Sequence, residues 1–193
     1  MNAPIDITGI VLHTARLTLR PFCMSDAEDL FAYASVDGVG QMAGWLPHRT
    51  IEDTYRILKL FIREKKTFAI EYDGHCIGSF GIEYYDETAH PTFDTLRCRE
   101  IGYVLSKAYW GQGLMPEAVN AVLTYLFGSV NLDAVFCANF TYNKQSARVQ
   151  EKCGFHYLCY GTFQTQFGTT EQTVVRILHR DEWTKIRNSQ VSA

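Results

Sequence analysis

The sequence predicts an α/β (α+β) protein with a single mixed sheet in which most strands are antiparallel. Its segments follow the order β-α-α-β-β-β-α-β-α-β-β. Two strand-like runs joined at Asp73-Gly74 indicate a hairpin, and therefore an antiparallel pair. Strand–helix–strand units in the second half of the chain indicate that some neighbouring strands run parallel.

The first half of the chain contains two helices between strands. The predicted elements are a strand at 15–20, a helix at 25–34, a glycine-rich loop at 35–49 and a helix at 51–66. Pro21 ends the strand. Ser25 and Glu28 have capping-box spacing, and Thr50 is expected to cap the second helix.

The second half alternates strands with helices. A hairpin at 67–85 and a polar loop at 86–94 are followed by a strand at 97–105, a helix at 115–127, a strand at 132–140, a helix that stops at Gly154, and strands at 155–163 and 173–180. Gly128 is expected to close the helix at 115–127.

Composition is that of an ordinary globular protein. The 193 residues are 47% apolar and 20% charged, without repeats or linkers, which predicts one domain over 1–193. The net charge of −3 argues against nucleic acid as the main ligand.

Cysteine usage and the absence of targeting segments predict a cytoplasmic protein. The six cysteines form no C-x-x-C pair, and four lie in apolar or alternating runs, where a free thiol behaves as a small hydrophobe. Their even number leaves three disulfides as the alternative. No signal peptide or run of 18 apolar residues is present, so no membrane association is expected.

The stretch "YWGQGLMPEA", residues 109–118, places two glycines between a strand and a helix. Gly111 and Gly113 would let backbone N–H groups approach an anion at the positive end of the helix dipole. A purely structural turn would have the same sequence, so both interpretations remain open.

Two linked segments resemble the acetyl-CoA core of the GNAT superfamily of N-acetyltransferases. They are "REIGYVLSKAYWGQGLMPEAVNAVLTYLF" and "NFTYNKQSARVQEKCGF", within residues 97–155. The opening "TARLTLRPFCMSDAEDLFAY" resembles the branch that contains the ribosomal-protein N-terminal alanine acetyltransferases. The resemblance implies a GNAT fold with a parallel, splayed strand pair flanked by helices. It also implies acetyl transfer from acetyl-CoA, as a cosubstrate, to a primary amine.

The resemblance assigns cofactor contacts to the turn and the strand before it. Its implied pyrophosphate-binding N–H groups belong to Trp110, Gly111, Gln112, Gly113, Leu114 and Met115. Trp110 replaces the usual Arg or Gln. Met115 replaces the usual Gly or Ala, and its side chain could narrow the phosphate approach or point into the core. Strand groups near Val104 and Leu105 would pair with the pantetheine arm.

In the second motif, the resemblance implies that the Asn143 side chain binds the pantetheine arm; a helix N-cap is the alternative. Ser146, one turn later, is a candidate proton donor or thiol anchor, or a helix-surface residue. Many superfamily members carry a tyrosine acid where this chain has Gln150.

Glu100 is the candidate general base because it lies on the strand expected to carry the thioester, and partial burial would raise its proton affinity. Strand alternation places Glu100, Gly102 and Val104 on one face. The alternative is a structural ion pair between Glu100 and Arg97 or Arg99.

The acceptor is expected to be a protein N-terminus or a small-molecule amine. Residues 83–87, "EYYDE", could form an acidic mouth for a cation or a solvated loop. Trp45 could line the acceptor cleft or pack in the core. The oligomeric state, monomer or homodimer, stays open.

Three other functions are alternatives. A nicotinamide site with Asp133 on the ribose is disfavoured because Pro116 occupies the third glycine position. A zinc site at Cys153, His156 and Cys159 lacks a fourth ligand, so no metal is expected. An acyl-CoA sensor or binding module without turnover is the alternative to an enzyme.

Overall fold

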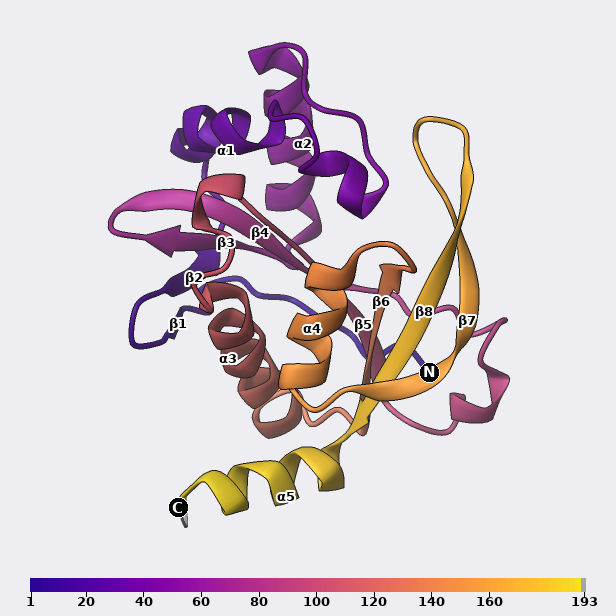
Figure 1. The fold of residues 1–193 in the computed structure, drawn as a ribbon. Helices are drawn as coiled ribbons and strands as arrows, with labels where there is room; N and C mark the ends of the chain where they lie inside the picture. Colours follow the sequence, from indigo (N-terminus) through magenta and orange to yellow (C-terminus); the bar gives the residue numbers. More distant parts are fainter. Residues whose placement is uncertain (192–193) are drawn as a thin grey trace.

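The computed structural model describes residues 1–191 of the chain (Figure 1). The strands and α-helices are β1 (Leu12–His13), β2 (Thr18–Pro21), α1 (Ala27–Ala34), α2 (Ile51–Glu64), β3 (Thr67–Tyr72), β4 (His75–Glu83), β5 (Cys98–Leu105), α3 (Leu114–Gly128), β6 (Ala134–Phe140), α4 (Lys144–Lys152), β7 (His156–Gln164), β8 (Thr170–His179) and α5 (Arg180–Val191). Short 3-10 turns are η1 (Met24–Asp26), η2 (Gly40–Ala43), η3 (Pro91–Phe93) and η4 (Lys107–Tyr109).

Within residues 1–191 the strands form one eight-stranded sheet in the order β1-β2-β3-β4-β5-β6-β8-β7. Neighbouring strands are antiparallel except for β5 and β6, which are parallel. That pairing runs only from Cys98 opposite Ala134 to Ile101 opposite Cys137. Beyond it the two strands no longer pair with each other, although β5 stays paired with β4 and β6 with β8, as the splayed pair of the predicted fold requires.

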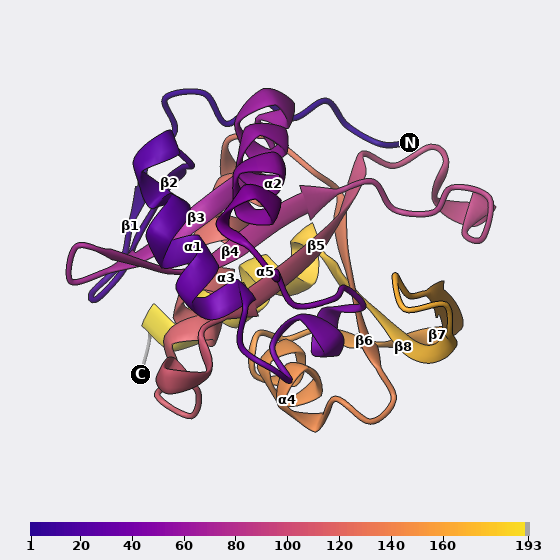
Figure 2. The same ribbon diagram turned by 90° about the horizontal axis from the view of Figure 1, so that it is seen from above.

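Helices cover both faces of the sheet (Figures 1 and 2). Helix α3 supplies Leu114, Val119 and Leu123 to a core that includes Phe80 and Ile101 from the sheet. Helices α1 and α2 pack on the opposite face, in a cluster that includes Leu30, Leu58 and Ala69. The sheet is therefore the middle layer, and the splayed ends of β5 and β6 lie between the helical layers.

The hairpin and several helix starts confirm local predictions. Asp73 and Gly74 have φ of 51° and 79°, the left-handed pair that a two-residue hairpin turn needs. Thr50 caps α2: its Oγ1 accepts from the Asp53 N–H at 3.3 Å, while Asp53 Oδ2 accepts from the Thr50 N–H at 3.2 Å.

Three local predictions were wrong. The strand predicted at 15–20 starts at Thr18, because Thr14 closes a turn through a 2.8 Å bond from the Leu17 N–H to its Oγ1. The capping box lies two residues earlier than predicted: the Cys23 N–H donates to Asp26 Oδ2 at 2.8 Å. Gly128 is the last residue of α3 rather than a residue beyond it.

Helix α5 was not predicted, because the predicted strand at 173–180 includes its first residue, Arg180. Its apolar residues Trp183 and Ile186, three apart, face the protein: Trp183 packs on Phe127 with ring centroids 5.2 Å apart. Glu182 Oε2 accepts from the His179 N–H at 2.9 Å. The i, i+3 apolar pair and the acidic first turn were the available signals.

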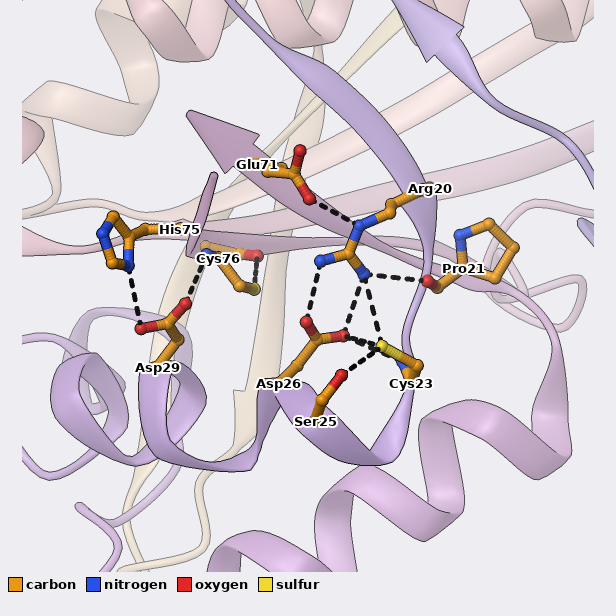
Figure 3. Close-up of polar contacts among 10 residues, drawn as sticks. Arg20, Pro21, Cys23, Ser25, Asp26, Asp29, Glu71, His75 and Cys76 are labelled. Atoms are coloured by element: carbon orange, nitrogen blue, oxygen red, sulfur yellow. Dashed lines mark hydrogen bonds and ion pairs between the residues drawn. The ribbon is translucent and has the colours of Figure 1, made fainter. Parts of the chain in front are cut away.

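A polar network joins β2, η1 and β3 (Figure 3). The Arg20 guanidinium donates to both Asp26 oxygens at 2.8 and 2.9 Å, and to Glu71 at 2.7 Å. Burial alone would raise the pKa of Asp26, but hydrogen bonds from Arg20 and the Cys23 N–H outweigh it and lower that pKa. Asp26 is only 4% exposed, so its charge is stabilised by these partners.

The Asp26→Asn substitution is expected to lower the free energy of unfolding at pH 7 by about 2 kcal/mol, because it removes one charge of a largely buried pair. Since the folded-state pKa is lowered, the contribution of Asp26 is fully present above its unfolded pKa, near 3.9, and is lost as pH falls through the folded value. Urea unfolding of both proteins at several pH values measures this, with exposed Asp94→Asn as control. An equal loss in both variants, or a difference that persists unchanged in acid, would contradict it.

All six cysteines lie within the described range and are free, and four of them are buried. In the part of the chain that the structure describes, no helix is long and apolar enough to cross a membrane.

Candidate functional site

A cleft of about 1020 Å³ opens where β5 and β6 separate. Its walls include Tyr103 and Val104 from β5 and Ala138 and Asn139 from β6. The glycine turn before α3 lies along the same cleft, as do α4 and one side of the β7–β8 hairpin. The residues predicted for cofactor binding and for catalysis therefore meet mostly in one cavity.

The glycine turn has the backbone geometry that an anion site requires. Gly111 and Gly113 have φ of 77° and 76°, in the left-handed region that favours glycine. Among residues 1–191, the N–H groups of Gly111, Gln112 and Gly113 make no hydrogen bond. Gly113 is the N-cap of α3, so the unpaired N–H groups of the first helical turn follow directly. Consecutive free donors thus lie at the positive end of a 15-residue helix.

Contacts on either side of the turn hold it in place. Arg16 donates to the Gln112 carbonyl at 3.0 Å and forms an ion pair with Glu117 in the first turn of α3. The Trp110 indole N–H donates to the Leu105 carbonyl at 2.8 Å. The turn is therefore tied to both the β1–β2 connection and the end of β5.

The side chains of the turn divide between cleft and core. Leu114 and Met115 are 1% and 6% exposed and belong to the main core, so the unusual Met115 side chain is accommodated by packing. Gln112 turns away, donating to the Ala108 carbonyl at 3.2 Å. The free hydrogen-bond donors that this turn presents to the cleft are therefore backbone N–H groups.

The end of β5 has one edge toward β4 and one toward the gap. A Cβ on Gly78 would meet the Val104 carbonyl oxygen at 2.3 Å, so that carbonyl faces β4. Successive residues of a strand alternate the edge to which their N–H and C=O point. The polar groups of Tyr103 and Leu105 consequently point toward the gap, where Trp110 already binds the Leu105 carbonyl.

Glu100 lies on the wall of the cleft, opposite Glu83 in the β4–β5 register. In the described part of the chain its carboxylate has no hydrogen bond or ion pair. Arg97 instead contacts Val130 and Asn131, and Arg99 donates to the Ala3 carbonyl at 2.6 Å. The alternative of a structural ion pair is therefore wrong. Burial raises the pKa of Glu100 to about 7, with the charges of Glu83 and Asp86 adding to the effect.

Asn143 is the N-cap of α4, as the alternative interpretation held. Its Oδ1 accepts from the Ser146 N–H at 3.1 Å, and its Nδ2 donates to the Met42 carbonyl at 3.2 Å. Asn143 and Ser146 both line the cleft, and Ser146 Oγ lies 3.2 Å from the Tyr103 hydroxyl. Because both polar atoms of the Asn143 side chain are engaged, a cofactor would have to displace or share the hydrogen bond from Nδ2 to the Met42 carbonyl.

The segment 83–87 is mostly engaged with protein. Glu83 pairs with Lys66, and Asp86 Oδ1 accepts from the Thr88 and Ala89 N–H groups at 2.9 Å. Tyr85 is 2% exposed and stacks on Phe136. Glu83 and Asp86 still line the cleft, so its acidic end is built from side chains that are already anchored.

Trp45 packs against the α1–α2 cluster, beside His48, in agreement with the core-packing alternative. The same loop contributes Met42 to the cleft instead. His90 and Phe163 also line it and were missed by sequence reasoning. His90 stacks on Phe136, and Phe163 contacts Phe140, both contacts between segments far apart in the chain. No local sequence signal marks such residues.

The zinc and nicotinamide alternatives find no support in the described residues. Within residues 1–191 no cluster of three or more His, Cys, Asp or Glu side chains could hold a metal. His156 Nδ1 lies 3.6 Å from Glu182 Oε2 instead. A doubly wound parallel sheet would be needed for a nicotinamide site, but the sheet is mostly antiparallel. Asp133, its candidate ribose ligand, binds Arg180 and the Arg97 N–H, both at 2.8 Å.

A mixed sheet with one splayed parallel pair, and a helix that starts at a glycine turn beside it, defines a class of acyltransferase folds. Residues 16–156 match the family model for the acetyltransferase (GNAT) domain. The chain belongs to this family of N-acetyltransferases.

Known proteins agree with this family. The chain is 30% identical over 152 residues to the protein called "Uncharacterized N-acetyltransferase YoaA" of Bacillus subtilis, covering 75% of this chain and 82% of that protein. Two solved structures share the fold. Ribosomal-protein-S5-alanine acetyltransferase from Vibrio fischeri has a TM-score of 0.68 at 21% identity, covering 90% and 98% of the two chains. Mycobacterium smegmatis RimJ in complex with CoA-disulfide has a TM-score of 0.69 at 20% identity, covering 89% and 88%.

Proposed function

We propose that this protein transfers the acetyl group of acetyl-CoA to a primary amine by direct attack. The observation that carries the proposal is the pairing of two features in one cleft: free backbone donors at Gly111–Gly113, and an unpartnered carboxylate at Glu100 whose pKa is raised to about 7. The first suits a pyrophosphate, and the second suits a base that accepts a proton near neutral pH.

In this proposal the N–H groups of residues 111–115 bind the pyrophosphate of acetyl-CoA, and the gap between β5 and β6 admits its pantetheine arm. The Trp110 N–H, which the resemblance also assigned to this site, is instead bonded to the Lys107 carbonyl at 3.3 Å. Of the strand groups near Val104 and Leu105, those of Val104 face β4, so the Leu105 N–H, which points toward the gap, is the one that binds the arm. It can donate to the arm or to the thioester oxygen, where it would stabilise the oxyanion. Asn143 would contact the arm from the start of α4. The Mycobacterium smegmatis protein of the same fold was solved in complex with CoA-disulfide, which supports binding of a coenzyme A derivative by this fold.

The reaction then needs a proton acceptor and a stabilised leaving group. The amine nitrogen attacks the thioester carbon, a C–N bond forms, and the surplus proton of the nitrogen passes to Glu100 and on to solvent. The C–S bond breaks with its electron pair on sulfur, beside Ser146. Strand β5 therefore carries the base, and α4 carries the residue that assists the thiolate.

The acceptor is a protein N-terminus or a small-molecule amine. The name of the Vibrio fischeri relative, which refers to an alanine of ribosomal protein S5, supports a protein acceptor. The acidic end of the cleft, with Glu83 and Asp86, supports a cationic one. We further propose that residues 1–193 act as one domain in the cytoplasm, which agrees with the single sheet and the free thiols.

Two measurements test the proposal. Calorimetry with coenzyme A and acetyl-CoA should show binding, and a DTNB assay of thiol release should find turnover in a screen of N-terminal peptides, polyamines, aminoglycosides and amino acids. Failure to bind coenzyme A would overturn the assignment. Binding without thiol release from any amine would favour an acyl-CoA sensor instead.

A further inference from the structure

A chain of hydrogen bonds runs from β8 through α4 to the wall of the cleft. The Arg176 Nη1 donates to Gln150 Oε1 at 3.1 Å and to Asn139 Oδ1 at 2.6 Å. Gln150 Nε2 donates to Ser146 Oγ at 3.2 Å, and Ser146 Oγ lies 3.2 Å from the Tyr103 hydroxyl. Gln150 is 1% exposed and Arg176 is 9% exposed, so most of this row of hydrogen bonds is shielded from water.

The direction of these bonds follows from the donors available. A guanidinium has only donors, so the Gln150 amide must turn its oxygen toward Arg176. Its NH₂ group then faces Ser146, and a flip of the amide would place two donors against each other. Arg176 also donates to Glu151 at 3.0 Å, which holds the guanidinium in position independently of Gln150.

The consequence falls on the Ser146 hydroxyl. One of its lone pairs is occupied by the Gln150 N–H, so its own proton points to Tyr103 or into the cleft. Burial raises the pKa of Tyr103 well above its usual value, so this phenol stays protonated and can donate to Ser146 in turn. The Tyr103 hydroxyl has two acceptors on Ser146, the backbone carbonyl at 3.4 Å and Oγ at 3.2 Å. When it donates to Oγ, donation from both neighbours strengthens the donor character of the Ser146 O–H.

We propose that Gln150 and Arg176 are positioning residues that keep the Ser146 hydroxyl a hydrogen-bond donor to the sulfur of coenzyme A. This inference rests on the proposed function, because it assigns how the leaving thiolate is stabilised. Ser146 keeps its proton: it donates a hydrogen bond to the sulfur, which carries away the electron pair of the broken C–S bond. Gln150 thus contributes from a position that never touches the substrate.

The Gln150→Glu variant tests the donor–acceptor direction of these hydrogen bonds, because glutamate has almost the same shape as glutamine. A glutamate keeps the contact with Arg176 but offers Ser146 an acceptor, which draws the hydroxyl proton away from the sulfur. The readout is the pKa of the thiol in bound coenzyme A, followed by the ultraviolet absorbance of the thiolate. We expect the wild-type protein to lower this pKa by at least about one unit relative to free coenzyme A, and Gln150→Glu to abolish the decrease.

A double-mutant cycle separates positioning from a direct effect of the new charge. In the Ser146→Ala background, Gln150→Glu should leave the thiol pKa unchanged, because there is no hydroxyl to redirect. Gln172→Glu, on an exposed position of β8, is the matched control for charge. The melting temperature and the affinity for coenzyme A below the thiol pKa should match the wild type in Gln150→Glu, while kcat falls at least tenfold at unchanged KM for acetyl-CoA.

Failure of the positioning role and failure of the proposed function give different results. An unchanged thiol pKa in Gln150→Glu, additive effects in the cycle, or a loss confined to melting temperature and cofactor affinity would each overturn the positioning role. Wild-type protein that binds coenzyme A with a lowered thiol pKa but acetylates no amine would overturn the proposed function while supporting this inference. Failure of the wild type to bind coenzyme A would overturn both.

Discussion

The Glu100→Gln variant is expected to lose at least tenfold in kcat, toward the range of about 10²- to 10⁴-fold typical of a lost general base. The amide is isosteric and uncharged, so it cannot accept the proton of the attacking nitrogen. Cofactor affinity should be nearly unchanged, because Glu100 lies on the wall of the cleft away from the glycine turn that is proposed to bind the pyrophosphate. Steady-state kinetics with the acceptor found by screening, together with calorimetry, measure both quantities.

The pH dependence of kcat/KM in the wild type tests whether Glu100 is the base. Burial, aided by Glu83 and Asp86, raises the pKa of Glu100 to about 7, and only the ionised form can act as a base. The value of kcat/KM should therefore rise with pH through about 7, and this limb should be absent in Glu100→Gln. In Glu83→Gln the limb should shift to lower pH, because one repelling charge is removed.

Stability should change in the opposite direction to activity. A carboxyl whose folded-state pKa is raised favours the folded state below its unfolded pKa, near 4.3, and that contribution is lost as pH rises through about 7. Above this pH Glu100→Gln should be more stable than the wild type in urea unfolding, whereas the exposed control Glu52→Gln should be neutral in both assays. A rate equal to the wild type would remove Glu100 from the mechanism.

Replacing both glycines of the turn, Gly111→Ala with Gly113→Ala, is expected to weaken coenzyme A binding by about 30-fold or more. Both residues have φ near +77°, where a Cβ costs about 1–2 kcal/mol per residue. The turn would relax away from this conformation, and binding would have to restore it before the N–H groups could converge on the pyrophosphate. Calorimetry with coenzyme A measures the loss.

Gly128→Ala is the matched control, because Gly128 ends the same helix with ordinary φ and has open space around the position of a Cβ. It should leave affinity unchanged and the far-ultraviolet spectrum intact. Wild-type affinity in the double variant would show that the turn is only structural, which was the alternative interpretation of its sequence.

The elements that were predicted correctly are those specified by near neighbours. The Asp73-Gly74 turn and the Thr50 cap depend on contacts within about four residues, so their sequences carry the signal. The glycine turn before α3 is held by distant Arg16, but its two left-handed residues are neighbouring glycines, which is a local signal as well. The Ser25–Glu28 capping box failed for the complementary reason. Asp26 is selected as the cap partner by Arg20, which is brought to it by the packing of β2 on β3.

The functional residues can be divided in the same way, into those that local sequence indicates and those that only the tertiary structure identifies. Sequence alone determined the family resemblance, the glycine turn and the candidates Glu100, Asn143 and Ser146, because these occur in motifs of short span. Tertiary structure decided that Glu100 lacks an ion-pair partner, and that Met115 packs in the core. It also decided that Arg176 orients Gln150 toward Ser146. Protonation and hydrogen-bond direction depend on burial and on groups that folding brings together from distant segments, and no local pattern encodes those distances.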